Sequence, residues 1–107
     1  MSIQSATPAE IKQRLDQGED LLLIDVRERE ELALAAVEGA RVCPLSEAAG
    51  WIDSVPHDRT LVLMCHHGVR SMHTAIALET RGYDKLINMT GGIDLWSVQV
   101  DPSVPRY

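Results

Sequence analysis

The sequence predicts an α/β fold with a mostly parallel sheet and helices on both of its faces. Short apolar runs alternate with helix-forming stretches along the 107 residues, which is the order expected of β-α-β units. Two of these runs, at residues 21–26 and 61–64, are almost continuously apolar, as strands of a parallel sheet are when both faces are covered. A chain of this length supports one hydrophobic core, so we expect a single domain over residues 1–107.

In the first half of the chain, capping residues, a glycine and a proline mark where the expected helices and strands begin or end. Thr7 and Glu10 form a capping box around a proline at the first helical position, and Gly18 ends the helix that they start. Pro44 ends a later strand because proline lacks the N–H that a strand ladder needs. The acidic face of residues 28–36 is interpreted as solvated rather than as a binding surface. The expected elements are a strand at residues 3–4, a helix from 8 to about 17, a strand at 21–26, a helix at 28–36 and a strand at 40–43.

The second half continues the alternation. Ser46 is a candidate N-cap, and Leu45 and Trp51 are candidate packing groups beside it. Gly50 lowers the stability of the helix that follows, which favours an irregular segment. Gly82 is an ordinary helix stop. The expected elements are a helix at residues 46–55, a strand at 61–64, a helix at 71–80, a strand at 84–89, a helix from 91 to about 98 and an extended tail at 101–105.

Composition and charge exclude several classes of protein. The net charge is −6, which argues against nucleic acid as a bulk electrostatic partner. Residues 1–58 carry a net charge of −7 and residues 59–107 one of +1, so the second half still suits a small anion. No apolar stretch is long enough to span a bilayer, and residues 1–5 lack the pattern of a secretory signal. We therefore expect a cytoplasmic protein without a membrane partner.

The two cysteines, Cys43 and Cys65, are too few for a disulfide framework and share no metal-ligand spacing. A bridge between them stays open, but the reduced pair is favoured because cytosolic disulfides are rare. Cys43 lies in an apolar stretch just before Pro44 and is interpreted as a core residue.

The chemistry of this chain is concentrated in residues 61–71. Four apolar residues form a strand, Cys65 stands at its end, and Arg70 follows five positions later with Gly68 between them. A strand, a short loop and a helix start make an anion cradle, because successive backbone N–H groups point inward. A thiol on the floor of this cradle is stabilised as the nucleophilic thiolate. A lone cysteine can also be a buried structural thiol, but this setting favours catalysis.

Arg70 is the natural anion clamp, because its planar guanidinium grips an oxyanion with two donors. An arginine at a helix start is unfavourable against the helix dipole, so its presence there indicates a negative partner. His66 and His67 either donate hydrogen bonds or line the rim. A metal site made of Cys65, His66, His67 and His73 is disfavoured, since adjacent ligands do not match the usual tetrahedral spacings. His73 is at most a neighbour of the site, and we expect no metal.

Asp25 and Arg27 lie at a second strand end that reaches the same edge of the sheet, where parallel sheets bind ligands. An aspartate in an apolar strand needs donors, and either the loop amides or Arg27 supply them. These two residues are expected to buttress the site, although a strand-end ion pair without a role in turnover stays an alternative. Gly91-Gly92 and Trp96 are interpreted as structural, a tight turn followed by a packing residue.

Three stretches of this sequence resemble the signature motifs of rhodanese-like sulfurtransferases, in the same order along the chain. The family's active-site loop reads C-x-x-G-x-R-S, one of its strands ends in D-V-R, and a G-G-x-x-x-W signature lies near its C-terminus. The matching stretches are Cys65-His66-His67-Gly68-Val69-Arg70-Ser71, Asp25-Val26-Arg27 and Gly91-Gly92-Ile93-Asp94-Leu95-Trp96. The family's G-H-I-P-G-A segment is Ala35-Ala36-Val37-Glu38-Gly39-Ala40 here, a departure that bears on the local turn and on partner surfaces more than on the chemistry.

The resemblance implies the small five-stranded rhodanese fold and a thiosulfate sulfurtransferase that works by double displacement without a cofactor. Its thiolate would take the outer sulfur of a small anionic donor such as thiosulfate, release sulfite, and pass the sulfur from a persulfide to cyanide, a thiol or a protein. We expect a monomer. The implied residues are Cys65 as the nucleophile, His66, His67, Gly68, Val69, Arg70 and Ser71 as the substrate-binding loop, and Asp25 and Arg27 in support.

Two alternatives stay open. A cysteine-dependent phosphatase or arsenate reductase would place five residues between its cysteine and arginine, whereas four lie between Cys65 and Arg70, and the shorter ring favours a sulfur atom. The second alternative is a non-catalytic rhodanese-like module that binds or senses. Such modules often lack the cysteine, which this chain keeps together with its glycine and arginine.

Overall fold

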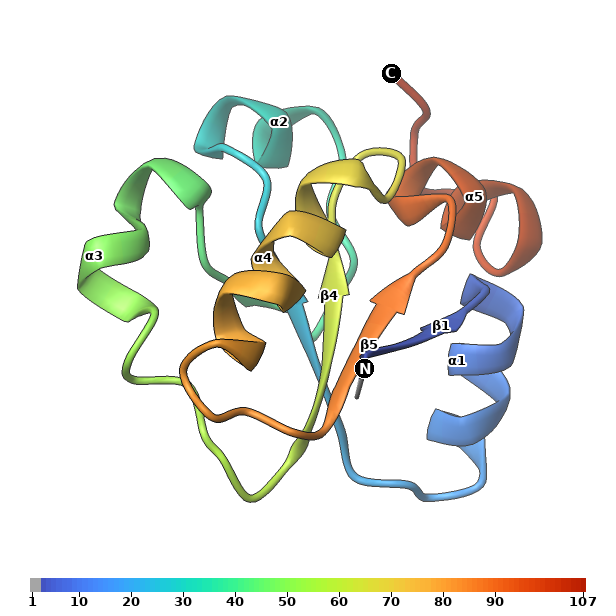
Figure 1. Cartoon of the computed structure of the whole chain (residues 1–107). Coiled ribbons are helices and arrows are strands. Elements are labelled where there is room, and N and C mark those ends of the chain that lie inside the picture. Colours follow the sequence, from blue (N-terminus) through green and yellow to red (C-terminus); the bar gives the residue numbers. More distant parts are fainter. Residues whose placement is uncertain (1–2) are drawn as a thin grey trace.

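A parallel sheet of five strands is the centre of the fold in the computed structural model, which describes residues 3–107. The strand order is β1-β5-β4-β2-β3, and every neighbouring pair is parallel (Figure 1). The predicted α/β class with a five-stranded sheet is confirmed. Met1 and Ser2, part of the N-terminal stretch interpreted above, lie outside the described residues. The strands are β1 (Ile3–Ala6), β2 (Leu21–Asp25), β3 (Arg41–Val42), β4 (Thr60–Met64) and β5 (Leu86–Met89).

Helices cover both faces of the sheet, as predicted. Figure 1 shows α4 crossing in front of the strands, while α1 and α5 lie together on the right of the view. None of the helices within residues 3–107 has the length and apolar character needed to cross a membrane. The helices are α1 (Pro8–Asp16), α2 (Arg29–Leu34), α3 (Ala48–Trp51) with a 3₁₀ turn η1 (Leu45–Glu47) before it, α4 (Val69–Glu79) and α5 (Gly92–Gln99).

The central strand β4 contributes to two separate cores. Leu61 and Leu63 pack into a cluster with residues of α3 and α4, whereas Val62 and Met64 pack into a cluster with residues of α1 and α5. All four side chains are fully buried. Because successive strand residues point to opposite faces, a strand between two cores must be apolar throughout, which is why the pattern of residues 61–64 was informative.

Several element boundaries differ from the prediction. The helix expected at 71–80 begins at Val69, because Gly68 adopts a left-handed conformation with φ of 107° and ends the loop two residues earlier. The helix expected at 46–55 is reduced to η1 and the four residues of α3, as the glycine in it had suggested. The strand expected at 84–89 starts only at Leu86.

The register of the sheet positions the candidate site. Asp25 at the end of β2 lies beside Met64 at the end of β4, and the Val26 N–H donates to the Met64 carbonyl at 2.9 Å. The residues that follow both strands therefore emerge side by side at one edge of the sheet. This edge brings Asp25 and Arg27 close to the loop that starts at Cys65.

Candidate active site

Cys65 is held by backbone N–H groups at the end of β4. Its side chain is buried, with 1% of the residue exposed. The Sγ atom accepts hydrogen bonds from the Gly68 N–H at 3.0 Å and from the Ser71 N–H at 3.4 Å. Such inward N–H groups stabilise negative charge on the atom that they face. The cradle predicted from the sequence is therefore present, and it is aimed at the sulfur.

Ser71 and Asn88 continue this network below the sulfur. The Ser71 Oγ lies 3.3 Å from Cys65 Sγ and donates to Asn88 Oδ1 at 2.5 Å. The Asn88 amide also donates to the Gly68 carbonyl at 3.1 Å. Asn88 was not predicted as a site residue. The signal in the sequence that could have identified it is a single amide among the apolar residues of β5.

The start of α5 supports the loop from behind. The Ile93 N–H donates to the Cys65 carbonyl at 2.9 Å, and the Asp94 N–H donates to the His66 carbonyl at 3.2 Å. A Cβ atom on Gly92 would clash with both of these carbonyl groups. The Gly91-Gly92 pair therefore does more than form the predicted tight turn, since it lets the backbone of α5 approach the loop that starts at Cys65.

Arg70 has an internal negative partner, Glu31 of α2. Its Nη1 and Nη2 atoms donate to the two Glu31 carboxylate oxygens, each at 2.7 Å. The bond from Arg70 is the main reason that the pKa of Glu31 falls to about 2, and the same pairing raises the pKa of Arg70. The expectation that Arg70 needs a negative partner is met within the chain. The interpretation of residues 28–36 as a merely solvated acidic face is wrong for Glu31.

Asp25 and Arg27 form a buried ion pair beneath α2. Asp25 is 1% exposed and Arg27 0%, and Arg27 Nη2 donates to Asp25 Oδ2 at 2.7 Å. Burial alone would lower the pKa of Arg27, but its hydrogen bonds to Asp25 and Tyr107 outweigh this effect and raise it. Arg27 also donates to the carbonyl oxygens of Glu31 and Ala35. Arg27 is thus the donor that Asp25 needed, and it ties α2 to the sheet edge through the Glu31 and Ala35 carbonyls.

A stack of three rings forms the rim of the loop. The Tyr107 ring lies on His66 with centroids 3.9 Å apart and an interplanar angle of 5°, and His66 lies on His67 at 3.9 Å and 29°. The Tyr107 hydroxyl donates to Glu31 and accepts from Arg27, each at 3.0 Å. Sequence reasoning missed Tyr107, because no local pattern connects the last residue of the chain with a loop 41 positions earlier.

Val69, predicted as part of the binding loop, and His73, expected to be at most a neighbour of the site, lie outside the cradle. Val69 is 65% exposed at the start of α4, and His73 is exposed further along that helix. The structure does not assemble the metal group of Cys65, His66, His67 and His73 that the sequence had disfavoured. It instead brings His66 and His67 to Asp94, with one ligand atom from each within 4.8 Å of the others.

Cys43 is a core residue, as predicted. It is 1% exposed and carries a free thiol, as does Cys65. Burial is the main cause that raises the pKa of the Cys43 thiol. The favoured reduced pair is therefore the state of both cysteines in this structure.

Known proteins are similar to this chain in sequence and in fold. The family model of the rhodanese-like domain matches residues 7–99. The chain is 36% identical to "Probable adenylyltransferase/sulfurtransferase MoeZ" of Mycobacterium tuberculosis, over 94% of this chain and 26% of that protein, so it spans about a quarter of MoeZ. It is 28% identical to thiosulfate sulfurtransferase GlpE of Haemophilus influenzae, over 90% of each protein. The crystal structure of a rhodanese-like domain protein from Staphylococcus aureus superposes with a TM-score of 0.82 at 27% identity, covering 97% of this chain and 98% of that one.

Proposed function

The chain belongs to the rhodanese-like domain family, and from this premise we propose that it is a sulfurtransferase that carries sulfur as a persulfide on Cys65. The observation that carries the proposal is the pair of backbone N–H groups, from Gly68 and Ser71, that converge on the Cys65 Sγ atom. Converging donors of this kind favour a thiolate, and a thiolate is the form of cysteine that attacks sulfur.

The first half-reaction loads the cysteine. The Cys65 thiolate attacks the outer sulfur of thiosulfate, a new S–S bond forms to Cys65, and the S–S bond of the donor breaks. Sulfite leaves with the electron pair of that bond, and a persulfide anion remains on Cys65. The N–H groups of Gly68 and Ser71 stabilise this anion by the same electrostatics that an oxyanion hole uses.

The second half-reaction discharges the persulfide. A nucleophilic acceptor, which is cyanide in an assay and a thiol or a protein in the cell, attacks the outer sulfur, and the electron pair of the broken bond returns to Cys65 as thiolate. The name of the relative GlpE, a thiosulfate sulfurtransferase, supports thiosulfate as the donor. Four residues between Cys65 and Arg70 again favour a sulfur atom over the larger oxyanion of a phosphatase.

Arg70 is the proposed binding group for the donor anion. A guanidinium carries five N–H donors, and two of its nitrogens already hold Glu31. The ion pair orients the guanidinium, and its remaining donors can bind the sulfonate end of thiosulfate. His66 and His67, next to Cys65 at the rim, would line the approach. Asp25 and Arg27 would support the site indirectly, since Arg27 holds the backbone of α2 and α2 carries the Glu31 that binds Arg70.

We further propose that residues 1–107 act as one domain, as a monomer in the cytoplasm and without a resident cofactor. The match of the family model to residues 7–99 supports the single domain. A thiol or a protein is the proposed physiological acceptor.

Intact-mass measurement tests the persulfide directly. After incubation with thiosulfate the protein should gain the mass of one sulfur atom, and cyanide should remove it. Cys65→Ser should show neither event, whereas Cys43→Ser should behave as the parent. A sulfur adduct that maps only to Cys43 would overturn the assignment. The absence of any adduct would favour the non-catalytic module instead.

A further inference from the structure

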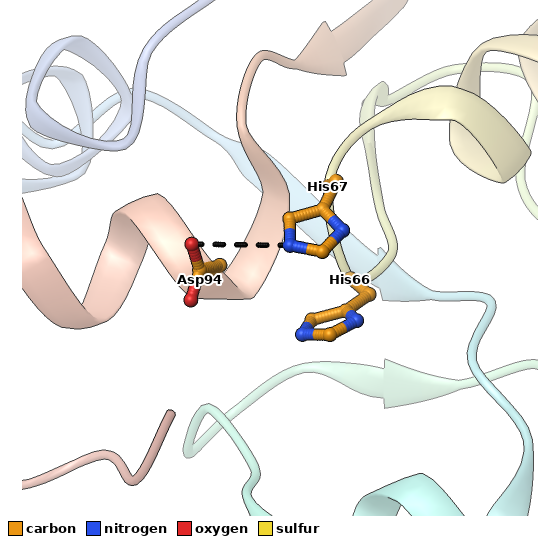
Figure 2. A group of neighbouring side chains, drawn as sticks. All are labelled: His66, His67 and Asp94. Carbon is orange, nitrogen blue, oxygen red and sulfur yellow. Dashed lines mark ion pairs between the residues drawn. The ribbon is translucent and has the colours of Figure 1, made fainter. Parts of the chain in front are cut away.

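Three side chains with metal-binding chemistry meet beside the catalytic loop. His66 and His67 come from the loop and Asp94 from the first turn of α5, and one ligand atom of each lies within 4.8 Å of the other two. Figure 2 shows that both rings turn a nitrogen toward the side on which the Asp94 carboxylate lies. The His67 Nε2 atom is 3.9 Å from Asp94 Oδ2. Two imidazoles and a carboxylate are the ligands that zinc takes at sites with an open position.

The His66 Nε2 atom gives a second, independent indication. It is buried, and it has no hydrogen-bond partner among residues 3–107. Buried polar side-chain atoms in folded proteins nearly always have a partner, and leaving one unpaired costs free energy. A metal ion bound at this nitrogen would satisfy it, since neutral imidazole offers a lone pair there.

The backbone holds the two parts of this group together. The Asp94 N–H donates to the His66 carbonyl at 3.2 Å, so the carboxylate and the first histidine lie on segments that are bonded to each other. The Tyr107 ring stacks on His66 and limits its rotation. Ligand atoms around tetrahedral zinc are about 3.3 Å apart, so ligand atoms that lie up to 4.8 Å apart must approach one another by up to about 1.5 Å. The exposed His67, with 61% of its side chain accessible, can provide most of that movement.

We propose that His66, His67 and Asp94 form a binding site for a divalent transition-metal ion of the zinc class. The three residues supply two nitrogen ligands and one oxygen ligand, and water would complete the coordination. Because His66 follows Cys65 directly in the chain, the bound ion places positive charge at the mouth of the catalytic loop. Metal binding at this site does not depend on the proposed sulfur transfer. The site also differs from the group containing Cys65 and His73 that the sequence disfavours.

The C-terminal segment competes with the metal for Asp94. The Arg106 Nε and Nη2 atoms donate to the two Asp94 oxygens at 2.8 and 3.1 Å, and this pairing is the main cause that lowers the pKa of Asp94. A carboxylate keeps further lone pairs when it accepts from one arginine, so the metal can still bind. The positive charge of Arg106 repels a divalent cation, however, and its removal should strengthen binding.

Isothermal titration of the full chain with zinc chloride tests the proposal, with the parent and Cys65→Ser measured side by side. Cys65→Ser separates the histidine–aspartate site from zinc bound to the catalytic thiol. Each protein should bind one ion. His67→Ala and Asp94→Asn should weaken binding by at least about tenfold, since even the loss of an indirect supporting partner costs about 10- to 100-fold. Arg106→Gln should tighten it about two- to fivefold, the range of an exposed ion pair.

The matched control is His73→Ala, which removes an exposed histidine outside the group and should bind zinc as the parent does. Cobalt(II) gives a second readout, because its spectrum should lack a sulfur-to-metal charge-transfer band in both the parent and Cys65→Ser. Loss of binding in Cys65→Ser would assign the metal to the thiol and overturn the proposal. Equal affinity in the parent, His67→Ala and Asp94→Asn would overturn it as well, and so would no binding at millimolar zinc.

Discussion

Cys65 and Cys43 belong to the same apolar cluster on one face of the sheet, and each is 1% exposed. Each cysteine also follows the carboxyl end of a strand, β4 for Cys65 and β3 for Cys43. The difference lies in what surrounds the sulfur. Cys65 Sγ accepts from two backbone N–H groups, whereas the Cys43 thiol is desolvated and its pKa is raised.

Burial therefore does not distinguish a structural cysteine from a candidate nucleophile. Burial alone disfavours the thiolate, whereas hydrogen-bond donors and positive charge beside the sulfur favour it. At Cys43 the Arg41 side chain acts in this direction, but burial outweighs it and the pKa of the thiol is raised. The donors at Cys65 exist because the chain turns at Gly68 and then starts α4. Cys43 is followed by Pro44, which has no N–H to offer. We expect this difference to control the reactivity of the two thiols.

The largest effect is expected from Arg70→Ala, which removes the charged group next to Cys65 and leaves Cys43 untouched. The kcat/KM value for thiosulfate should fall. Converted to free energy, this fall corresponds to a loss of about 2–4 kcal/mol of transition-state stabilisation, as expected for a lost charge-assisted contact. Steady-state kinetics measure this loss. Arg70→Lys should recover only part of it, because an ammonium lacks the fork of donors. A large fall in melting temperature with normal kinetics would show that Arg70 instead anchors the fold.

Gly92→Ala should perturb the Cys65 loop through its backbone. The new Cβ would clash with the carbonyl groups of Cys65 and His66, and a displacement of about 1 Å at a catalytic group costs about 100-fold in rate. Sulfur transfer per folded molecule, with folding checked by thermal unfolding, is the measurement.

Gly50→Ala is the matched control on the Cys43 side. A Cβ on Gly50 meets nothing within 4 Å, so this variant should keep its activity and should be no less stable than the parent. If both glycine variants retained full activity, support of the loop by α5 would be irrelevant to turnover.

Alkylation compares the two thiols directly. At neutral pH iodoacetamide should modify Cys65 at least about tenfold faster than Cys43, because the raised pKa of Cys43 leaves it as the unreactive thiol. Reaction at Cys43 should increase as the pH rises into the alkaline range. Peptide mapping over time measures both rates, and thiosulfate should protect only Cys65. Equal rates at neutral pH would contradict the distinction between the two sites.

The smallest effect is expected from Glu31→Gln, which removes the partner of Arg70. The folded-state pKa of Glu31 is about 2, below its unfolded value of about 4.3. The ion pair therefore contributes stability above about pH 4.3 and loses it as the pH falls toward 2. For a partly exposed pair this contribution is at most about 1 kcal/mol.

The free energies of unfolding of the parent and of Glu31→Gln, measured with urea, should thus differ at pH 7 and become equal in acid. Glu30→Gln is the control, because it removes the same charge from an exposed neighbouring position on α2. A difference between parent and Glu31→Gln that persists unchanged at pH 2 would have to come from packing rather than from charge.

The class of fold and the centre of the candidate site could both be predicted from the sequence. Both depend on local features. These features are short, almost continuously apolar runs, helix caps, and a cysteine, a glycine and an arginine within six residues. The hydrogen bonds of the cradle span at most six positions along the chain. Local features of this kind are visible because neighbours in sequence are necessarily neighbours in space.

The distant groups that complete the candidate site depend on tertiary packing and could not be predicted from the sequence. Glu31 reaches Arg70 across 39 positions, and Tyr107 reaches Arg27 across 80. Asn88 lies under Ser71 only because β5 pairs with β4 in the register that sets Leu63 beside it. A shift of one residue in that register would turn every side chain of the strand to the opposite face. Such partners depend on the packing of whole elements, which is set by the sum of many weak contacts rather than by any one motif.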